Sequence, residues 1–166
     1  KQLKIYLHVN DKFRLPENPE TNIIMVGPGT GIAPFRAFIE ERNWQRDQGM
    51  KVGKDWLFFG DQRQAYDYIY GEELEAYKSK YDIEITTAFS RDQEQKFYVQ
   101  NRMQEHANEI FKWLESGAYF YVCGDARRMA KDVDTTLQQI IAMHGQNAET
   151  YIKNLKDTQR YCRDVY

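Results

Sequence analysis

Three glycines within five residues follow an apolar, β-branched run near the start of the sequence. Gly27, Gly29 and Gly31 come directly after the run at 23–26, and Thr30 adds a hydroxyl between two of them. Glycine lacks a Cβ, so the backbone can turn sharply and let a ligand approach closely. If a helix begins just after this loop, its unpaired amides and the positive end of its dipole face the loop. This order of residues favours a phosphate-binding turn at the end of a buried strand.

The spacing of these glycines is G-x-G-x-G. It matches neither the G-x-G-x-x-G dinucleotide fingerprint nor the P-loop, which ends in Gly-Lys-Ser or Gly-Lys-Thr. Spacing alone therefore leaves two interpretations open. The glycines bind a pyrophosphate, or they only form a tight turn between a strand and a helix.

Composition excludes several classes of protein. The chain has 166 residues, of which 42% are hydrophobic and 14% aromatic, and a formal net charge of −2. These values are typical of a globular domain and argue against a nucleic-acid-binding surface. No apolar run approaches the ~20 residues that a membrane span requires. With two cysteines and three dispersed histidines, we expect neither a disulfide framework nor a metal site. The low cysteine content also predicts a reducing, cytoplasmic location.

Strand and helix patterns alternate along most of the sequence. The alternation predicts a doubly wound α/β fold with a parallel sheet of about five strands, whose carboxyl ends bind the ligand. We expect strands at 22–26, 55–59, 82–89 and 118–122, helices at 33–48, 70–80, 98–115, 125–144 and 147–158, and an extended tail at 160–166.

The first residues follow a different pattern. Lys1 to Asn10 alternates between apolar and polar residues, as in an amphipathic strand, and the polar segment 11–20 contains two prolines. This change of pattern predicts a domain boundary. We expect residues 1–16 to end a preceding domain and residues 17–166 to form a nucleotide-binding domain.

Polar residues after the second and third predicted strands bear on the choice of nucleotide. Asp61 follows the second strand, where an acidic residue in an ordinary dinucleotide fold binds ribose hydroxyls and favours NADH. Ser90 and Arg91 follow the third strand, with Lys96 and Tyr98 just beyond. Two cations and two hydroxyls suit a phosphate dianion and favour NADPH.

Five motifs in this order resemble the NADPH-binding domain of the ferredoxin-NADP reductase superfamily. Within it they are most similar to the diflavin reductases, and among these to the flavoproteins that serve sulfite reduction. The motifs are G27-P-G-T-G-I-A-P-F-R36, W56-L-F-F-G60, S90-R-D-Q-E-Q-K-F-Y-V-Q100, Y121-V-C-G-D-A-R-R-M-A-K-D132 and R163-D-V-Y166. The resemblance covers the whole chain, because it also explains residues 1–16 as the last strand and exit of an FAD-binding barrel.

The resemblance implies a role for each site residue. Cys123 and Asp164 would lie at the nicotinamide and assist hydride transfer, and Tyr166 would cover the flavin ring. The residues implied to bind NADP are Gly29, Thr30, Gly31, Arg63, Ser90, Arg91, Lys96, Tyr98, Gln100, Arg127, Met129 and Asp132.

The function implied is that of an NADPH-dependent flavoprotein oxidoreductase. Hydride would pass from NADPH to FAD, and electrons then through FMN to a haemoprotein that reduces sulfite to sulfide, in cysteine biosynthesis. The partners would be the FAD-binding and FMN-binding domains of the same longer chain, and the full-length protein would be an oligomer. The resemblance implies no nucleic-acid partner and no membrane partner. The alternatives are the NADPH domain of another flavin reductase, such as a cytochrome P450 reductase, and a nucleotide-binding module without redox activity.

Overall fold

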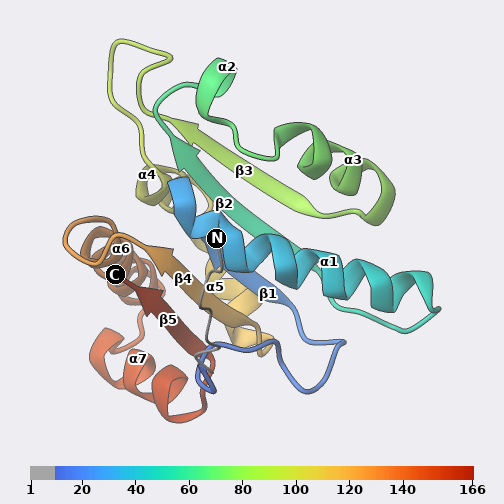
Figure 1. The fold of residues 1–166 in the computed structure, drawn as a ribbon. Coiled ribbons are helices and arrows are strands. Elements are labelled where there is room, and N and C mark those ends of the chain that lie inside the picture. The colour runs from blue at the N-terminus through green and yellow to red at the C-terminus, as the bar shows by residue number, and fades with distance from the viewer. Residues whose placement is uncertain (1–9) are drawn as a thin grey trace, which may run out of the picture.

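The structure, a computed structural model, describes residues 10–166 and contains one parallel sheet. The sheet confirms the predicted doubly wound α/β fold with about five strands. Its strand order is β3-β2-β1-β4-β5 (Figure 1). The strands are β1 (Ile23–Val26), β2 (Asp55–Asp61), β3 (Glu84–Phe89), β4 (Tyr119–Gly124) and β5 (Tyr161–Val165). The strand predicted at Lys1 to Asn10 lies, but for Asn10, outside the described residues.

Helices cover both faces of this sheet (Figure 1). One face packs against α1 (Ala33–Asp47) and α3 (Gly71–Tyr81). The opposite face packs against α4 (Val99–Glu105), α5 (Ala107–Glu115), α6 (Met129–Met143) and α7 (Ala148–Asp157). Two short turns complete the chain, the 3-10 turn η1 (Gly29–Ile32) and α2 (Gln64–Asp67).

Successive residues of the central strands face opposite sides of the sheet. Ile24 and Val26 enter the core beneath α4 to α7, whereas Ile23 and Met25 enter the core beneath α1 and α3. All four side chains are fully buried. A strand that is buried on both faces is continuously apolar instead of alternating, which explains the run of sequence before the glycines.

The structure corrects the predicted helices in three places. The helix predicted at 98–115 is interrupted at His106, whose φ is −103° and whose ring packs edge-on against Trp56. The helix predicted from residue 125 begins at Met129, because the Asp125 carboxylate accepts hydrogen bonds from the backbone N–H groups of Arg128 and Met129. The turn α2 lies in a segment predicted as loop.

The segment before β1 packs closely on the domain. Phe13 is buried, and its ring lies 5.5 Å from the Tyr121 ring. The Tyr121 hydroxyl donates a hydrogen bond of 2.7 Å to the carbonyl of Arg14. These contacts fix residues 13 and 14 against β4, while the boundary expected after residue 16 stays a prediction.

A buried ion-pair network joins α1 to the start of β2. Arg42 and Asp55 are 1% and 0% exposed, and Arg42 Nε lies 2.5 Å from Asp55 Oδ1. Arg46 reaches the other carboxylate oxygen at 2.8 Å. Arg42 also donates to the carbonyls of Pro19 and Thr21. Burial lowers the pKa of Arg42 and the carboxylate of Asp55 opposes this effect, so the charge is kept only because it is paired.

We expect Arg42→Met to lower the free energy of unfolding by about 3 kcal/mol, because it leaves the buried Asp55 carboxylate short of a partner. Urea unfolding at neutral pH measures this loss. Arg14→Met, at an exposed arginine paired with Asp11, is the control and should change stability by less than about 1 kcal/mol. Equal effects of the two substitutions would show that the buried network does not contribute more than a surface pair.

Candidate functional site

A cleft of about 480 Å³ opens at the carboxyl ends of the strands, on the side of α4 and α6. This is the edge at which the alternating pattern predicted a ligand. The cleft lies between the glycine turn, the ends of β2 and β3, and the first turns of the two helices. Its lining residues are Pro28, Gly29, Gly60, Asp61, Gln62, Ala88, Ser90, Tyr98, Val99, Gln100, Asp125, Arg128, Met129 and Asp132.

The glycine turn is the first turn of a continuous helical segment. The 3-10 turn η1 runs directly into α1, which carries Pro34 in its first turn. Gly29 has a φ of +56°, which glycine adopts without strain. A Cβ on Gly31 would lie 2.2 Å from the carbonyl oxygen of Cys123. Both glycines are therefore required, one for its conformation and the other for the close approach of η1 to the end of β4.

The loops after β2 and β3 are joined by backbone and side-chain hydrogen bonds. The N–H groups of Ser90 and Arg91 donate to the carbonyls of Asp61 and Gln62 at 2.9 and 2.8 Å. The Asp92 carboxylate accepts from the N–H of Gln64 at 2.9 Å. These bonds continue the pairing of the two strands beyond the sheet and hold Ser90, which is only 9% exposed, in the wall of the cleft.

The three cations predicted to contact a phosphate lie on these joined loops. The side chains of Arg63, Arg91 and Lys96 are exposed, and none of them lines the cleft. Arg91 directly follows Ser90, and Arg63 begins the turn α2, with its N–H bonded to the Asp67 carboxylate at 2.9 Å. The structure thus places these cations on the two joined loops, one of which also carries Ser90.

The opposite wall comes from α4 and α6. Tyr98 and Gln100 stand at the start of α4, and Met129 and Asp132 lie in the first turn of α6. The Gln100 amide donates a hydrogen bond of 3.3 Å to the Asp132 carboxylate, and this bond links the two helices. All four residues were predicted from the sequence to contact the nucleotide, and the structure brings them together.

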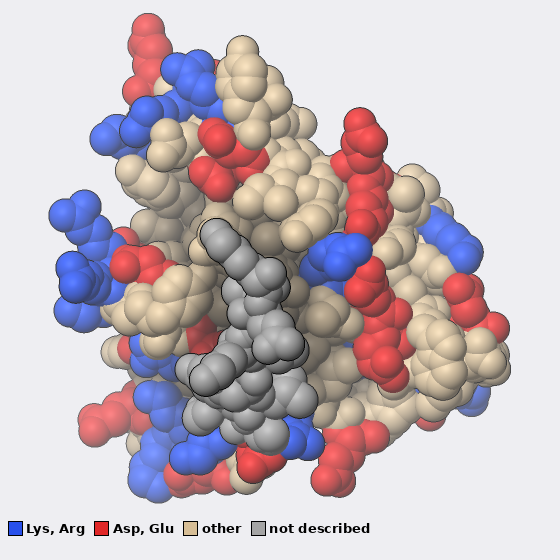
Figure 2. Space-filling model, viewed as in Figure 1, with Lys and Arg blue, Asp and Glu red and all other residues tan. Residues whose placement is uncertain are grey.

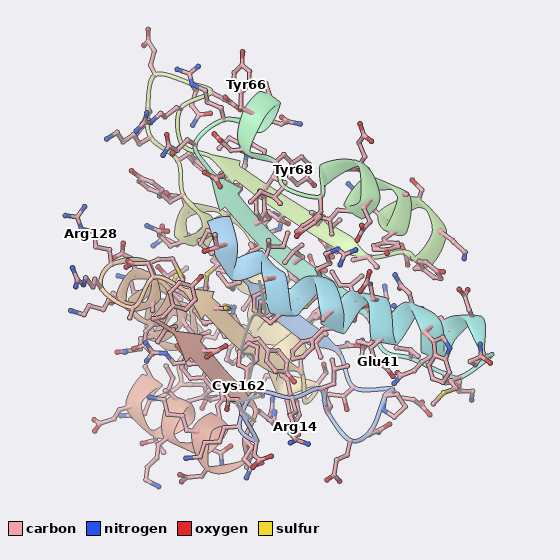
Figure 3. The ribbon with its side chains drawn as sticks, in the orientation of Figure 1. Arg14, Glu41, Tyr66, Tyr68, Arg128 and Cys162 are labelled. Atoms are coloured by element: carbon pink, nitrogen blue, oxygen red, sulfur yellow. The ribbon has the colours of Figure 1, made fainter. Side chains whose placement is uncertain are left out.

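The loop before α6 is shaped by Asp125. Its carboxylate accepts hydrogen bonds from the N–H groups of Arg128 and Met129 at 2.8 and 3.2 Å, and these bonds lower its pKa. The loop thereby presents Arg128 to the cleft, whereas the predicted Arg127 is exposed and outside it. Figure 3 shows Arg128 projecting outward at the left of the molecule. The sequence offers two consecutive arginines and no signal for which of them faces the cleft.

Cys123 and Asp164 form a second group at the end of β4. They are register partners on the parallel strands β4 and β5, so their side chains share one face of the sheet. Cys123 shares the buried cluster of Phe35 and Ile39 from α1, on the face opposite to α4 and α6. Burial, assisted by the negative charge of Asp164, raises the pKa of the Cys123 thiol to about 11. The thiol is therefore neutral at physiological pH.

Tyr166 connects this second group to the glycine turn. Its N–H donates to the carbonyl of Gly124 at 3.1 Å, and its carbonyl accepts from the N–H of Ala126 at 2.9 Å. Its hydroxyl shares a hydrogen bond of 2.7 Å with the Thr30 hydroxyl. The residue is nevertheless 67% exposed. The glycine turn thus carries the cleft on one side and Cys123, Asp164 and Tyr166 on the other.

Charge is distributed unevenly around this edge. Figure 2 shows Lys and Arg side chains at the left, over the loop before α6, and at the upper left, over the loop between β3 and α4, with some Asp and Glu side chains among them; Asp and Glu side chains are more frequent on the right-hand side, with some Lys and Arg side chains between them. The loop between β3 and α4 carries Arg91 and Lys96, and the loop before α6 carries Arg127 and Arg128. A polyanionic ligand would be attracted to the basic side.

Residues 10–166 are the part of the chain that the structure describes. In this part of the chain, no helix has the length and apolar character needed to cross a membrane. Within the same residues, no three His, Cys, Asp or Glu side chains are grouped so that they could hold a metal ion.

The chain is similar in sequence to proteins of known name. The chain is 46% identical, over 99% of its length, to the flavoprotein alpha-component of NADPH sulfite reductase of Yersinia pestis. It is 46% and 47% identical, again over 99% of its length, to the proteins of the same name from Klebsiella pneumoniae and Serratia proteamaculans. The chain spans 27% or 28% of the length of these relatives.

These similarities confirm the resemblance inferred from the five motifs. The family model described as "Oxidoreductase NAD-binding domain" matches residues 25–135, from β1 into α6. The matched range includes the glycine turn, the Ser90 loop and both helical walls of the cleft. The chain therefore belongs to the family of oxidoreductase NAD-binding domains.

Proposed function

We propose that this chain binds NADPH at the carboxyl edge of the sheet and presents its nicotinamide to a flavin held by another domain of a longer protein. The observation that carries the proposal is the cleft itself. It places Ser90, followed by the exposed Arg91, beside the glycine turn at the end of β1. The two anionic parts of NADPH, the pyrophosphate and the 2′-phosphate, would each find donors there.

The residues of the cleft fit this ligand. A Cβ on Gly29 would lie in the space between the turn and the Asp61 carboxylate. Because glycine has no Cβ, the backbone of the turn is open to a pyrophosphate there. Thr30 and the first amides of the helical segment add donors. The Ser90 hydroxyl, with Arg91, Lys96 and Tyr98, would bind the 2′-phosphate, and Arg63 would add a further positive charge. Gln100, Met129 and Asp132 would border the remaining parts of the nucleotide, and the exposed Arg127 would contact it from outside the cleft.

The group around Cys123 would receive the nicotinamide. When bound, NADPH supplies a hydride from C4 of that ring. The neutral Cys123 thiol offers a small, polarizable surface and no covalent chemistry. The Asp164 carboxylate would stabilise the positive charge that develops as the ring is oxidised. The glycine turn separates the two ends of the site, so that one elongated ligand would contact both.

Tyr166 would shield the flavin ring until the nicotinamide replaces it. Its exposed ring is anchored through the backbone to Gly124 and Ala126 and through its hydroxyl to Thr30. Stacking of a flat ring on another flat ring gives this shielding its physical basis. The link to Thr30 would couple the position of the ring to the turn that holds the pyrophosphate.

The longer protein is proposed from the relatives. Their printed name is that of a flavoprotein component of NADPH sulfite reductase. By this similarity, FAD in an adjoining barrel and FMN in a further domain would carry the electrons to a haemoprotein that reduces sulfite to sulfide. We expect an oligomeric assembly in the cytoplasm, and residues 1–16 to be the exit of the FAD-binding barrel. The flavoprotein of another acceptor, such as a cytochrome P450, would use the same cleft.

We expect Arg91→Ala to weaken NADPH binding 10- to 100-fold and to leave NADH binding unchanged, because only NADPH carries the 2′-phosphate. Isothermal titration calorimetry of the chain with each nucleotide measures both affinities. Lys51→Ala removes the same charge at the opposite edge of the sheet and is the control. Equal affinity of the unmodified chain for NADPH and NADH would contradict the proposal.

We expect Asp164→Asn to lower the pKa of Cys123 below its value of about 11, because the carboxylate is the second cause of that raised pKa, after burial. The pKa should stay above 9.0, the ordinary value of the thiol, since burial is unchanged. The ¹³Cβ chemical shift of isotopically labelled cysteine, followed against pH in a Cys162→Ala background, measures it. An unchanged pKa would show that the two side chains are not coupled, and the proposed pairing would fail.

A further inference from the structure

Asp61, the last residue of β2, lies between the two anion-binding parts of the cleft. In the sheet, β2 is flanked by β1, which leads into the glycine turn, and by β3, which leads into Ser90. The Oδ2 atom of Asp61 lies 3.8 Å from the position that a Cβ would occupy on Gly29. Its backbone carbonyl accepts the N–H of Ser90 at 2.9 Å. Asp61 therefore lies next to both parts and lines the cleft between them.

The carboxylate of Asp61 is fixed in orientation and has acceptor capacity left. Oδ1 accepts a hydrogen bond of 2.7 Å from the N–H of Gln62. Among residues 10–166, this is the one hydrogen bond of the carboxylate, and no Lys or Arg side chain pairs with it. An ionised carboxylate accepts about four hydrogen bonds, so Oδ2 offers unused acceptor sites to the cleft.

The chemistry of NADPH decides what can face this oxygen. The pyrophosphate and the 2′-phosphate are attached to the same adenosine ribose, so only this sugar separates the two anionic groups. A carboxylate repels both phosphates, but it accepts a hydrogen bond from a hydroxyl. The hydroxyl that remains on this ribose is the one on C3′.

We propose that Asp61 is a ribose-binding residue of the cleft and that its carboxylate accepts a hydrogen bond from the 3′-hydroxyl of the adenosine ribose. The inference rests on the proposed NADPH-binding function and adds to it a residue that neither the motifs nor the comparisons assign to the site. It also explains how an acidic residue at the end of β2, typical of NADH sites, is compatible with a 2′-phosphate. The carboxylate recognises the sugar, and the phosphate is recognised by the next loop.

A purely electrostatic role of Asp61 and the proposed hydrogen bond predict opposite effects on nucleotide binding when the carboxylate is removed. If the carboxylate only repels the phosphates, its removal strengthens binding of any anionic nucleotide at this site. If it accepts the 3′-hydroxyl, its removal weakens binding, and only of ligands that carry this hydroxyl.

The experiment compares adenosine 2′,5′-bisphosphate with its 3′-deoxy analogue by calorimetry on the unmodified chain, Asp61→Ala and Glu94→Ala. Glu94 is an exposed carboxylate on the loop that carries Ser90, so its substitution controls for loss of one negative charge. We expect the 3′-deoxy analogue to bind the unmodified chain and Glu94→Ala about tenfold more weakly than the parent ligand, the lower end for a hydrogen bond to a charged group. Asp61→Ala should bind both ligands equally. Circular dichroism confirms that each variant is folded.

The outcomes separate this inference from the function on which it rests. If the unmodified chain binds adenosine 2′,5′-bisphosphate but the ratio between the two ligands is the same in Asp61→Ala, the role of Asp61 is wrong and the NADPH site stands. If Asp61→Ala binds both ligands more tightly, the carboxylate acts by repulsion. If the unmodified chain binds neither ligand, the proposed function fails, and the inference fails with it.

Discussion

The close approach of the glycine turn to the end of β4 is the constraint on which the rest of the site depends. Gly31 lies so near the backbone of Cys123 that a single added Cβ would come within 2.2 Å of its carbonyl oxygen. This contact sets η1 over the central strands and directs α1 across one face of the sheet. At its far end α1 is held by the buried pairing of Arg42 with Asp55. The position of the turn is thus fixed from both ends of one helical segment.

From this position the turn divides the carboxyl edge into two regions. The cleft with Ser90, Gln100 and Asp132 lies toward α4 and α6, and Cys123 with Asp164 lies toward α1. Our proposal that one dinucleotide extends over both regions follows from this division. The hydrogen bond between Thr30 and Tyr166 joins the glycine turn to the region of Cys123 and Asp164.

Much of the fold was predictable because its signals are local. Buried runs such as Ile23–Val26 identify parallel strands, and the alternation with helices determines that the strands are parallel. The interruption at His106 and the start of α6 at Met129 were not predictable. The first depends on how an imidazole packs against Trp56 and the second on which amides one carboxylate accepts. Both are tertiary or side-chain effects that periodicity does not contain.

The site was predictable in its residue types and less so in its geometry. The motifs pointed to Gly29, Ser90 and Asp132, and in the structure these three residues line one cleft. They could not distinguish Arg128, which lines the cleft, from Arg127, which does not, because the conformation of the preceding loop decides between neighbouring arginines. The place of Asp61 between the glycine turn and the Ser90 loop likewise required the strand order, since β1 and β3 flank β2 only in the folded sheet.

The central claim is that the carboxyl edge of the sheet binds a nucleotide with a 2′-phosphate. A second cavity at the opposite edge, of about 460 Å³ and lined in part by Lys54, Asp82 and Glu84, provides an internal comparison. Titration of the isotopically labelled chain with adenosine 2′,5′-bisphosphate, followed by amide chemical shifts, tests the claim most directly. The account predicts shifts at Gly29, Ser90 and Arg91 and none around Lys54, Asp82 and Glu84. Shifts confined to the opposite edge, or none at all, would contradict it.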